Sequence, residues 1–324
     1  MNYLMSVPMK SIIAGTGSYL PGKILTNADL EKMVDTNDAW IVQRSGIRER
    51  RIAAKDETTG DMAVKAARKA LEAAGCAPEE IGGVIVATTT PDRVFPAVAV
   101  KVQAELGIPP GIAFDVQAVC TGFIYALSVA DNFIRLGQAK KILVIGAEKM
   151  SSIVDWKDRG TCVLFADGAG AVVLEGKEEA GDGVKGQGIH STHLYANGNQ
   201  REMLYTDEMR HIVMHGREVF KYAVTYMADI VAEVLEKNKI KPEEIDWLVP
   251  HQANIRIIEF TAKKLDMPMD KVVVTIDKHG NTSAASIPLT LDEAVRDGRV
   301  KRGDLLLMDA MGGGLTWGAA LVRY

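Results

Sequence analysis

Two segments of the chain are similar: PEEIGGVIVATT at residues 78–89 and PEEIDWLVPHQ at residues 242–252. Each copy begins with a proline and two glutamates, follows a stretch of helical periodicity and leads into a short apolar run, which predicts a buried strand. Similarity between two distant segments of one chain is typical of a duplicated unit. The two copies therefore predict that the chain folds as two related halves.

The similarity extends beyond these two segments at an offset of 161 residues, with an apolar strand following in both halves. Several matches in a row, in the same order of strand, turn, helix and strand, favour duplication over chance. The offset places Cys120 on Asn281, Asp131 on Asp292, Arg135 on Arg296, Gly137 on Gly298 and Lys141 on Arg302.

Along the chain, short apolar runs alternate with amphipathic helical patterns, and residues 271–281, KVVVTIDKHGN, are among the predicted strands. This alternation predicts the α/β class, with a mixed sheet in each half and helices on both faces. We expect halves at 9–178 and 179–324. A strand-like run follows Met9 directly, which makes residues 1–8 a candidate N-terminal extension.

The composition limits the functional classes. With 42 acidic and 38 basic residues among 324, the net charge is −4, which argues against a nucleic-acid-binding protein. Three widely separated cysteines do not form a disulfide framework and are typical of a reducing cytoplasm. No apolar run reaches the ~20 residues of a membrane helix. We expect a cytoplasmic protein without membrane or nucleic-acid partners.

Cys120 is the candidate nucleophile. It lies at a predicted helix N-terminus, where the helix dipole favours the thiolate, and its small neighbours Ala118 and Gly122 leave room for a substrate. The alternative is a buried structural cysteine, which is the commoner situation. Cys76 and Cys162 lack this setting and are interpreted as structural.

His251 and Asn281 are the candidate partners of Cys120. His251 follows an apolar run and Pro250, and Asn281 follows Gly280 in the position equivalent to Cys120. Functional groups of open α/β sheets gather beyond the carboxyl ends of strands, so the three residues can converge on one pocket if the halves are related by a twofold axis. A surface histidine and a turn or capping asparagine remain the simpler alternatives.

Metal and nucleotide sites are not expected. His190 and His193 have no third ligand at a useful spacing. The glycine-rich stretches at 166–171 and 311–318 match neither a P-loop nor a dinucleotide fingerprint. The backbone of Gly312–Gly314 is better suited to a close approach to a ligand and to donating an N–H group to an oxyanion.

Four motifs together resemble the β-ketoacyl-acyl-carrier-protein synthase III family of the thiolase superfamily. They are FDVQAVCTGF (114–123), VPHQANIRII (249–258), KHGNTSAAS (278–286) and GGGLTWGAALV (312–322). The block TNADLEKMVDTNDAWIVQRSGIRERRIA (26–53) is also similar to that family. The resemblance covers essentially the whole chain.

This resemblance implies a duplicated α/β/α/β/α fold, a homodimer and a catalytic set of Cys120, His251 and Asn281. The implied reaction condenses a short acyl-CoA with malonyl-acyl carrier protein, releases CO2 and initiates fatty-acid synthesis. The CoA thioester is a substrate, and no cofactor is implied. The backbone N–H groups of Cys120 and Gly313 would stabilise the oxyanion.

The resemblance also implies the binding contacts. Phe95 of the partner subunit would close the acyl pocket. The implied CoA contacts are Thr36, Trp40, Arg44, Arg159, Gly216, Phe220, Ala253 and Asn254, with the adenine between Trp40 and Arg159. The implied contacts to the acidic acyl carrier protein are Lys221, Gln252, Ala253, Asn254, Ile255 and Arg256.

Three other interpretations remain open on the sequence. The first is a related ketoacyl synthase of secondary metabolism with another acceptor. The second is a cysteine hydrolase of the Cys–His–Asn type, in which the asparagine would orient the histidine instead of being the counterpart of the cysteine. The third is a non-enzymatic acyl-CoA or carrier-protein binding module. The primer also stays undetermined, because Val119 and Thr121 stand where the family often has alanine.

Overall fold

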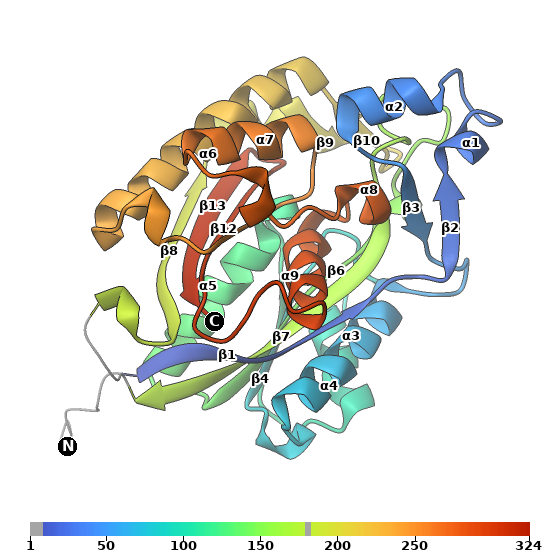
Figure 1. Ribbon diagram of the computed structural model, residues 1–324. Coiled ribbons are helices and arrows are strands. Elements are labelled where there is room, and N and C mark those ends of the chain that lie inside the picture. The colour runs from blue at the N-terminus through green and yellow to red at the C-terminus, as the bar shows by residue number, and fades with distance from the viewer. Residues whose placement is uncertain (1–8, 179–182) are drawn as a thin grey trace.

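The computed structural model describes residues 9–178 and 183–324. The candidate extension at 1–8 and the proposed start of the second half at 179 lie outside the described residues. Figure 1 shows two sheets with helices between them and helices on both outer faces. This arrangement confirms the predicted α/β class and the duplicated five-layer fold.

Each half contributes one mixed sheet. The first has the order β1-β7-β6-β4-β5, and the second has the order β8-β13-β12-β11. In both sheets the first two pairings are antiparallel and the pairings that follow are parallel. The bounds are β1 (Met9–Tyr19), β4 (Gly83–Ala87), β5 (Ile112–Val116), β6 (Lys141–Lys149), β7 (Asp167–Glu178), β8 (Gly188–Ala196), β11 (Trp247–Pro250), β12 (Leu305–Gly312) and β13 (Thr316–Arg323).

Three pairs of helices complete the layers. The outer face of the first sheet carries α3 and α4, the outer face of the second carries α6 and α7, and α5 and α9 lie between the sheets. The side chains of each layer form one continuous buried cluster with the adjoining sheet, and burial of this apolar surface stabilises the fold. The bounds are α3 (Thr59–Ala74), α4 (Val98–Leu106), α5 (Gly122–Arg135), α6 (Gly216–Asn238), α7 (Ile255–Lys264) and α9 (Ser286–Arg296).

The two central helices preserve the 161-residue relation. They end at equivalent residues, Arg135 and Arg296, and each arginine pairs with an aspartate one turn earlier on its own helix. The distance from Nε to the carboxylate is 2.7 Å for Arg135 and Asp131 and 3.2 Å for Arg296 and Asp292. The pairs show that the sequence repeat is a repeat of structure.

The halves differ at the sheet edge beside β11. Residues 271–281 were expected to form a strand, but only Val272 pairs there, in an isolated parallel bridge to Leu248. The next residues turn instead into the short helix α8 (Ile276–His279). The second sheet therefore lacks a full counterpart of β5, and the chain from this edge is free to carry Asn281 inward.

Smaller elements cover one side of the molecule, at the upper right of Figure 1. Their apolar side chains form a separate cluster that includes Leu30, Ile41 and Ile276. No helix in the described part of the chain is long and apolar enough to cross a membrane. The bounds are α1 (Asn27–Leu30), α2 (Asp38–Ser45), β2 (Lys23–Thr26), β3 (Glu49–Ile52), β9 (Leu204–Thr206) and β10 (Ile212–Met214).

Candidate active site

The candidate catalytic residues lie in the turns that follow strands β5 and β11 and helix α8. Cys120 occupies a one-turn 3-10 helix, Val119–Thr121, between β5 and α5. His251 directly follows β11, and Asn281 lies between α8 and the 3-10 turn that precedes α9. Val119 has a φ of 48°, which is strained for a β-branched residue and is typical of a turn that presents a functional side chain.

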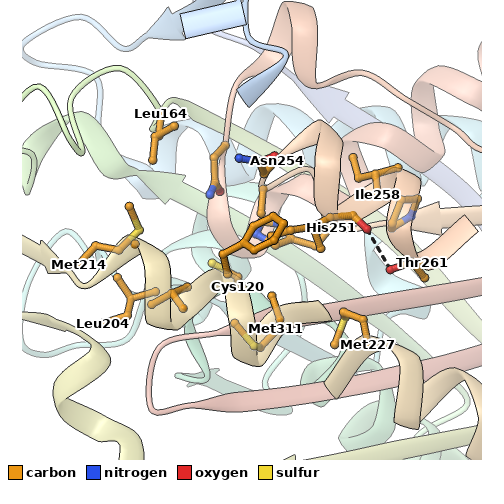
Figure 2. A pocket seen from close by; sticks show the side chains of 18 of the residues that line it. Cys120, Leu164, Leu204, Met214, Met227, His251, Asn254, Ile258, Thr261 and Met311 are labelled. Atoms are coloured by element: carbon orange, nitrogen blue, oxygen red, sulfur yellow. Dashed lines mark hydrogen bonds between the residues drawn. The ribbon is translucent and has the colours of Figure 1, made fainter. Parts of the chain in front are cut away.

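One cavity brings the three residues together. It has a volume of about 820 Å³ including its mouth, and Cys120, His251 and Asn281 all line it. Figure 2 shows Cys120 and His251 facing the same space, with Met311 beside them. The convergence expected from the two related halves is therefore present in the fold.

Cys120 is a buried thiol, 4% exposed. Burial raises the pKa of Cys120 to about 12, and a hydrogen bond to Ser283 only partly opposes this. The expectation that the helix dipole favours the thiolate stays a prediction. The helix proper begins at Gly122, two residues after Cys120, and desolvation of a thiolate opposes any stabilisation from the dipole.

His251 is 6% exposed and is held by its backbone, since its N–H donates to the carbonyl of Asp309 at 2.8 Å. Burial lowers the pKa of His251 to about 3, so the ring is neutral at pH 7. Within the described chain neither ring nitrogen has a hydrogen-bond partner. A buried, unpaired imidazole is unfavourable by itself and is suited to a bound ligand.

Asn281 is anchored on three sides. Its backbone N–H donates to Leu164 O, its own carbonyl accepts from Ala166 N, and its Oδ1 accepts from Ser283 N at 2.9 Å. Because Oδ1 is engaged, the Nδ2–H group is the side of the amide that can donate into the cavity. The neutral His251 and this amide can together hold a developing negative charge.

The glycine-rich end of β12 passes very close to Cys120. A Cβ atom on Gly312 would lie 2.6 Å from the backbone N of Cys120, so only glycine permits this approach. Gly313, the expected oxyanion donor, lines a second cavity that also reaches Cys120. Its role as a donor remains a prediction.

This second cavity was missed by sequence reasoning. It has a volume of about 970 Å³ and meets the first at Cys120. Its walls come from segments far apart in the chain, so no local pattern could identify them. They include Thr89, Gln117, Met150, Ile153, Phe165 and Tyr205.

Most of the expected CoA contacts lie along one groove. It has a volume of about 1320 Å³ and shares Gly216, Phe220 and Asn254 with the first cavity, so it leads towards Cys120. Trp40, Arg44 and Arg159 line its outer part, whereas Ala253 lines the inner cavity. Thr36 lines neither.

Two guanidinium groups, those of Arg44 and Arg159, lie over the ring of Trp40. The Cζ atoms lie 4.8 Å from the ring centroid for Arg44 and 5.5 Å for Arg159. Arg159 also donates to the carbonyl of Asp35 at 2.8 Å. An adenine between Trp40 and Arg159 would therefore require this exposed arginine to swing outward.

The expected carrier-protein contacts divide into two groups. Lys221 and Arg256 are exposed, and the guanidinium of Arg256 lies 4.9 Å from the ring centroid of Phe220. Ala253, Asn254 and Ile255 are half-buried. The side chain of Asn254 caps α7 and also donates to Arg44 O at 2.8 Å.

Gln252 was expected to contact the acyl carrier protein, and the structure corrects this expectation. It is 1% exposed, and its side-chain amide donates to Pro250 O and Val273 O and accepts from the N–H groups of Thr275 and Ile276. A fully paired, buried amide cannot reach a protein partner. Gln252 instead ties the His251 loop to the segment before α8.

Phe95 lies away from all of these cavities within one chain and is 82% exposed. Its contribution to an acyl pocket thus depends on a second subunit and remains a prediction. Within residues 9–178 and 183–324, no group of three or more His, Cys, Asp or Glu side chains is arranged to hold a metal ion.

Comparisons with known proteins identify the family to which this fold belongs. The family model described as 3-oxoacyl-[acyl-carrier-protein] synthase III matches residues 114–198, and the model for its C-terminal part matches 235–324. Beta-ketoacyl-[acyl-carrier-protein] synthase III of Rhodospirillum centenum is 58% identical over 98% of this chain and 100% of its own length. The same enzyme from Thioalkalivibrio sulfidiphilus is 60% identical over 96% of this chain and 98% of its own length.

A solved structure agrees with these relatives. The 3-oxoacyl-[acyl-carrier-protein] synthase III of Aquifex aeolicus superposes with a TM-score of 0.93 at 56% identity, covering 97% of this chain and 100% of its own. The protein is thus a condensing acyltransferase of the thiolase fold. It belongs to the β-ketoacyl-acyl-carrier-protein synthase III family.

Proposed function

We propose that this protein condenses a short acyl-CoA, with acetyl-CoA as the first candidate, with malonyl-acyl carrier protein through an acyl-Cys120 intermediate. The observation that carries the proposal is the single cavity shared by a buried thiol, a neutral imidazole and an amide, Cys120, His251 and Asn281. The groove from Trp40 and Arg44 to this cavity provides a path for the CoA thioester.

In the first step Cys120 attacks the thioester carbonyl. Because the pKa of Cys120 is raised to about 12, the thiol must lose its proton during the attack. The proton passes to the departing CoA sulfur, and the acyl group stays on Cys120. The backbone N–H groups of Cys120 and Gly313 would hold the oxyanion.

In the second step malonyl thioester loses CO2, and the electrons of the broken C–C bond form an enolate. No proton is abstracted, so the site needs hydrogen-bond donors and not a strong base. His251 and the Nδ2–H group of Asn281 are those donors, and each contributes about 3 kcal/mol in comparable sites. The enolate carbon then attacks the acyl group and releases the Cys120 thiolate.

We further propose that the enzyme works as a homodimer without a bound cofactor. In the described first sheet, β5 is the last strand, and edge strands readily pair with a second chain. Val94 and Phe95, which are 84% and 82% exposed, present an apolar surface that a partner subunit would cover. In this arrangement Phe95 would reach the cavity around Met150 in the other subunit.

The test follows both half-reactions. The protein is incubated with radiolabelled acetyl-CoA, and acetyl-Cys120 is sought by mass spectrometry; malonyl-acyl carrier protein or malonyl-CoA is then added. We expect label on Cys120, ketoacyl product with the carrier protein, and in Asn281→Ala a condensation rate lower by about 100-fold with acyl transfer retained. Absence of both the label and the product would refute the proposal.

A further inference from the structure

Ser283 is a polar residue beside the catalytic set that the reaction above leaves unused. It begins the one-turn 3-10 helix Ser283–Ala285, which leads directly into the inner helix α9 (Figure 1), and it is 0% exposed. Its φ of 51° lies in the left-handed region, which favours glycine. A side chain kept at such a position is typical of functional sites, so its contacts call for an explanation.

The backbone of Ser283 orients the amide of Asn281. Its N–H group donates to Oδ1 of Asn281 at 2.9 Å, and this contact leaves the Nδ2–H group to donate into the cavity. Because the bond comes from the main chain, it does not depend on which side chain stands at position 283. The hydroxyl group of Ser283 is therefore available for a separate role.

This hydroxyl group links the two halves of the molecule. It donates to Oε1 of Glu148, a fully buried residue of β6 in the first half, at 3.2 Å. An O–H group that donates to a carboxylate usually lies at roughly 2.5–2.7 Å. Thr90 Oγ1 meets Oε2 of the same carboxylate at 2.6 Å. Ser283 is thus a loosely held donor to Glu148.

Glu148 keeps other donors if Ser283 turns away. It accepts from the hydroxyl groups of Thr88 and Thr90 and from the backbone N–H groups of Thr89 and Thr90. All of these donors belong to the segment that follows β4, and none belongs to the second half. The carboxyl group therefore stays hydrogen-bonded without Ser283, and the loss of that one long bond costs little.

The second acceptor within reach of Ser283 is the sulfur of Cys120. A hydrogen bond between these side chains acts to lower the pKa of Cys120, against the larger effect of burial. The two turns pack directly on each other, since a Cβ atom on Gly122 would lie 3.4 Å from the Cβ atom of Ala284. A serine hydroxyl has one proton, so it can fully serve only one of its two acceptors at a time.

We propose that the hydroxyl group of Ser283 turns from Glu148 to the sulfur of Cys120 when the thiolate forms, and is the side-chain donor that stabilises this buried anion. The inference rests on the proposed function, in which Cys120 is a thiolate during acyl transfer and again after condensation. The hydroxyl keeps its proton throughout and only changes its acceptor.

The first cavity favours such a donor over a cation. Among its described lining residues there is no lysine or arginine that could pair with a thiolate. A hydrogen bond to a charged acceptor is stronger than one to a neutral acceptor, so the Ser283 hydroxyl should prefer the thiolate to the thiol. Its bond to Cys120 therefore strengthens at the moment when the negative charge appears.

The experiment compares Ser283→Ala with Ser283→Gly. Both variants remove the hydroxyl group and keep the backbone N–H group that orients Asn281. Alanine retains the restricted positive φ, whereas glycine adopts it freely, so the pair separates the loss of the hydroxyl from a change in the backbone. Ser128→Ala is the matched control, because it removes a serine hydroxyl of α5 that bonds to Thr192 at 2.8 Å and lines none of the three cavities.

Three rates are measured at one pH of about 8. They are alkylation of Cys120 by iodoacetamide, acyl transfer from acetyl-CoA to Cys120, and decarboxylation of malonyl-acyl carrier protein by the unacylated protein. The first two need the thiolate, whereas decarboxylation needs the donors of His251 and Asn281. The serine variants leave the other titratable groups around Cys120 in place, which are His251, Asp309, Arg201, Tyr205 and Glu148.

We expect both Ser283 variants to slow alkylation and acyl transfer by about tenfold, while decarboxylation stays within about twofold and Ser128→Ala matches the wild type. Unchanged alkylation in both variants overturns the inference. An equal loss of all three rates, or a loss in Ser283→Ala alone, does so as well, because either indicates a structural effect. If alkylation depends on Ser283 but the wild type transfers no acyl group, the proposed function fails and the role of the hydroxyl stands.

Discussion

Burial decides the chemistry of individual residues in this site more than local sequence does. Cys120 and His251 are both less than 10% exposed, and each is shifted towards its neutral form, because an ion is poorly solvated there. The resting site therefore avoids a buried ion pair.

This state of Cys120 predicts a pH-dependent reactivity. Since the pKa of Cys120 is raised to about 12, the thiolate fraction between pH 7 and 10 should rise about tenfold for each pH unit. The rate of alkylation of Cys120 by iodoacetamide, followed by mass spectrometry, should rise in the same proportion. Cys120→Ser gives the background from Cys76 and Cys162. A plateau below pH 8 would instead indicate the low-pKa thiolate expected from a helix N-terminus.

Between elements, β1 packs very closely against α3. A Cβ atom on Gly17 would lie 2.3 Å from the backbone N of Ala70, and one on Gly15 would lie 2.4 Å from that of Ala74. The strand and the helix thus approach through their backbones. A larger side chain at either glycine must force the two elements apart.

Gly17→Ala should accordingly destabilise the protein. We expect the free energy of unfolding to fall by about 3 kcal/mol, because the added methyl group meets backbone atoms that cannot rotate away. Gly22→Ala is the matched control, since a Cβ atom on Gly22 would meet nothing within 4 Å beyond its chain neighbours and the change should stay within about 0.5 kcal/mol. Chemical denaturation measures both; equal stability of the two variants would contradict this packing.

For the whole molecule, the exposed apolar pair Val94 and Phe95 is the feature that one chain leaves unexplained. Phe95→Arg would place a charge where the partner subunit is proposed to bury an aromatic ring, at a cost of several kcal/mol. We expect sedimentation to shift from dimer to monomer and the acyl-primer preference to broaden. Leu136→Arg, at another residue with 73% exposure, is the control. If Phe95→Arg keeps both the wild-type mass and primer preference, Phe95 is not at a subunit interface.

Much of this architecture was predictable because it is periodic or repeated. The repeat that begins at Pro78 and Pro242 predicted two related halves, and the offset of Cys120 on Asn281 predicted that these residues would meet. The fold confirms both expectations, because each half forms one mixed sheet and Cys120 and Asn281 line the same cavity. The strand predicted at 271–281 was wrong, because its apolar pattern fits a buried segment whose one bridge to β11 is at Val272.

The sequence by itself determined the class of the fold, the duplication and the three residues at the centre of the site, because strand and helix periodicity and the order of the motifs are local properties. Only the tertiary structure decided the burial of Cys120, the internal role of Gln252, the second cavity and the unpaired carboxyl oxygen of Asp309. These depend on which distant segments exclude water from a side chain and which donors they bring to it. Desolvation and hydrogen-bond pairing are set by the packed molecule.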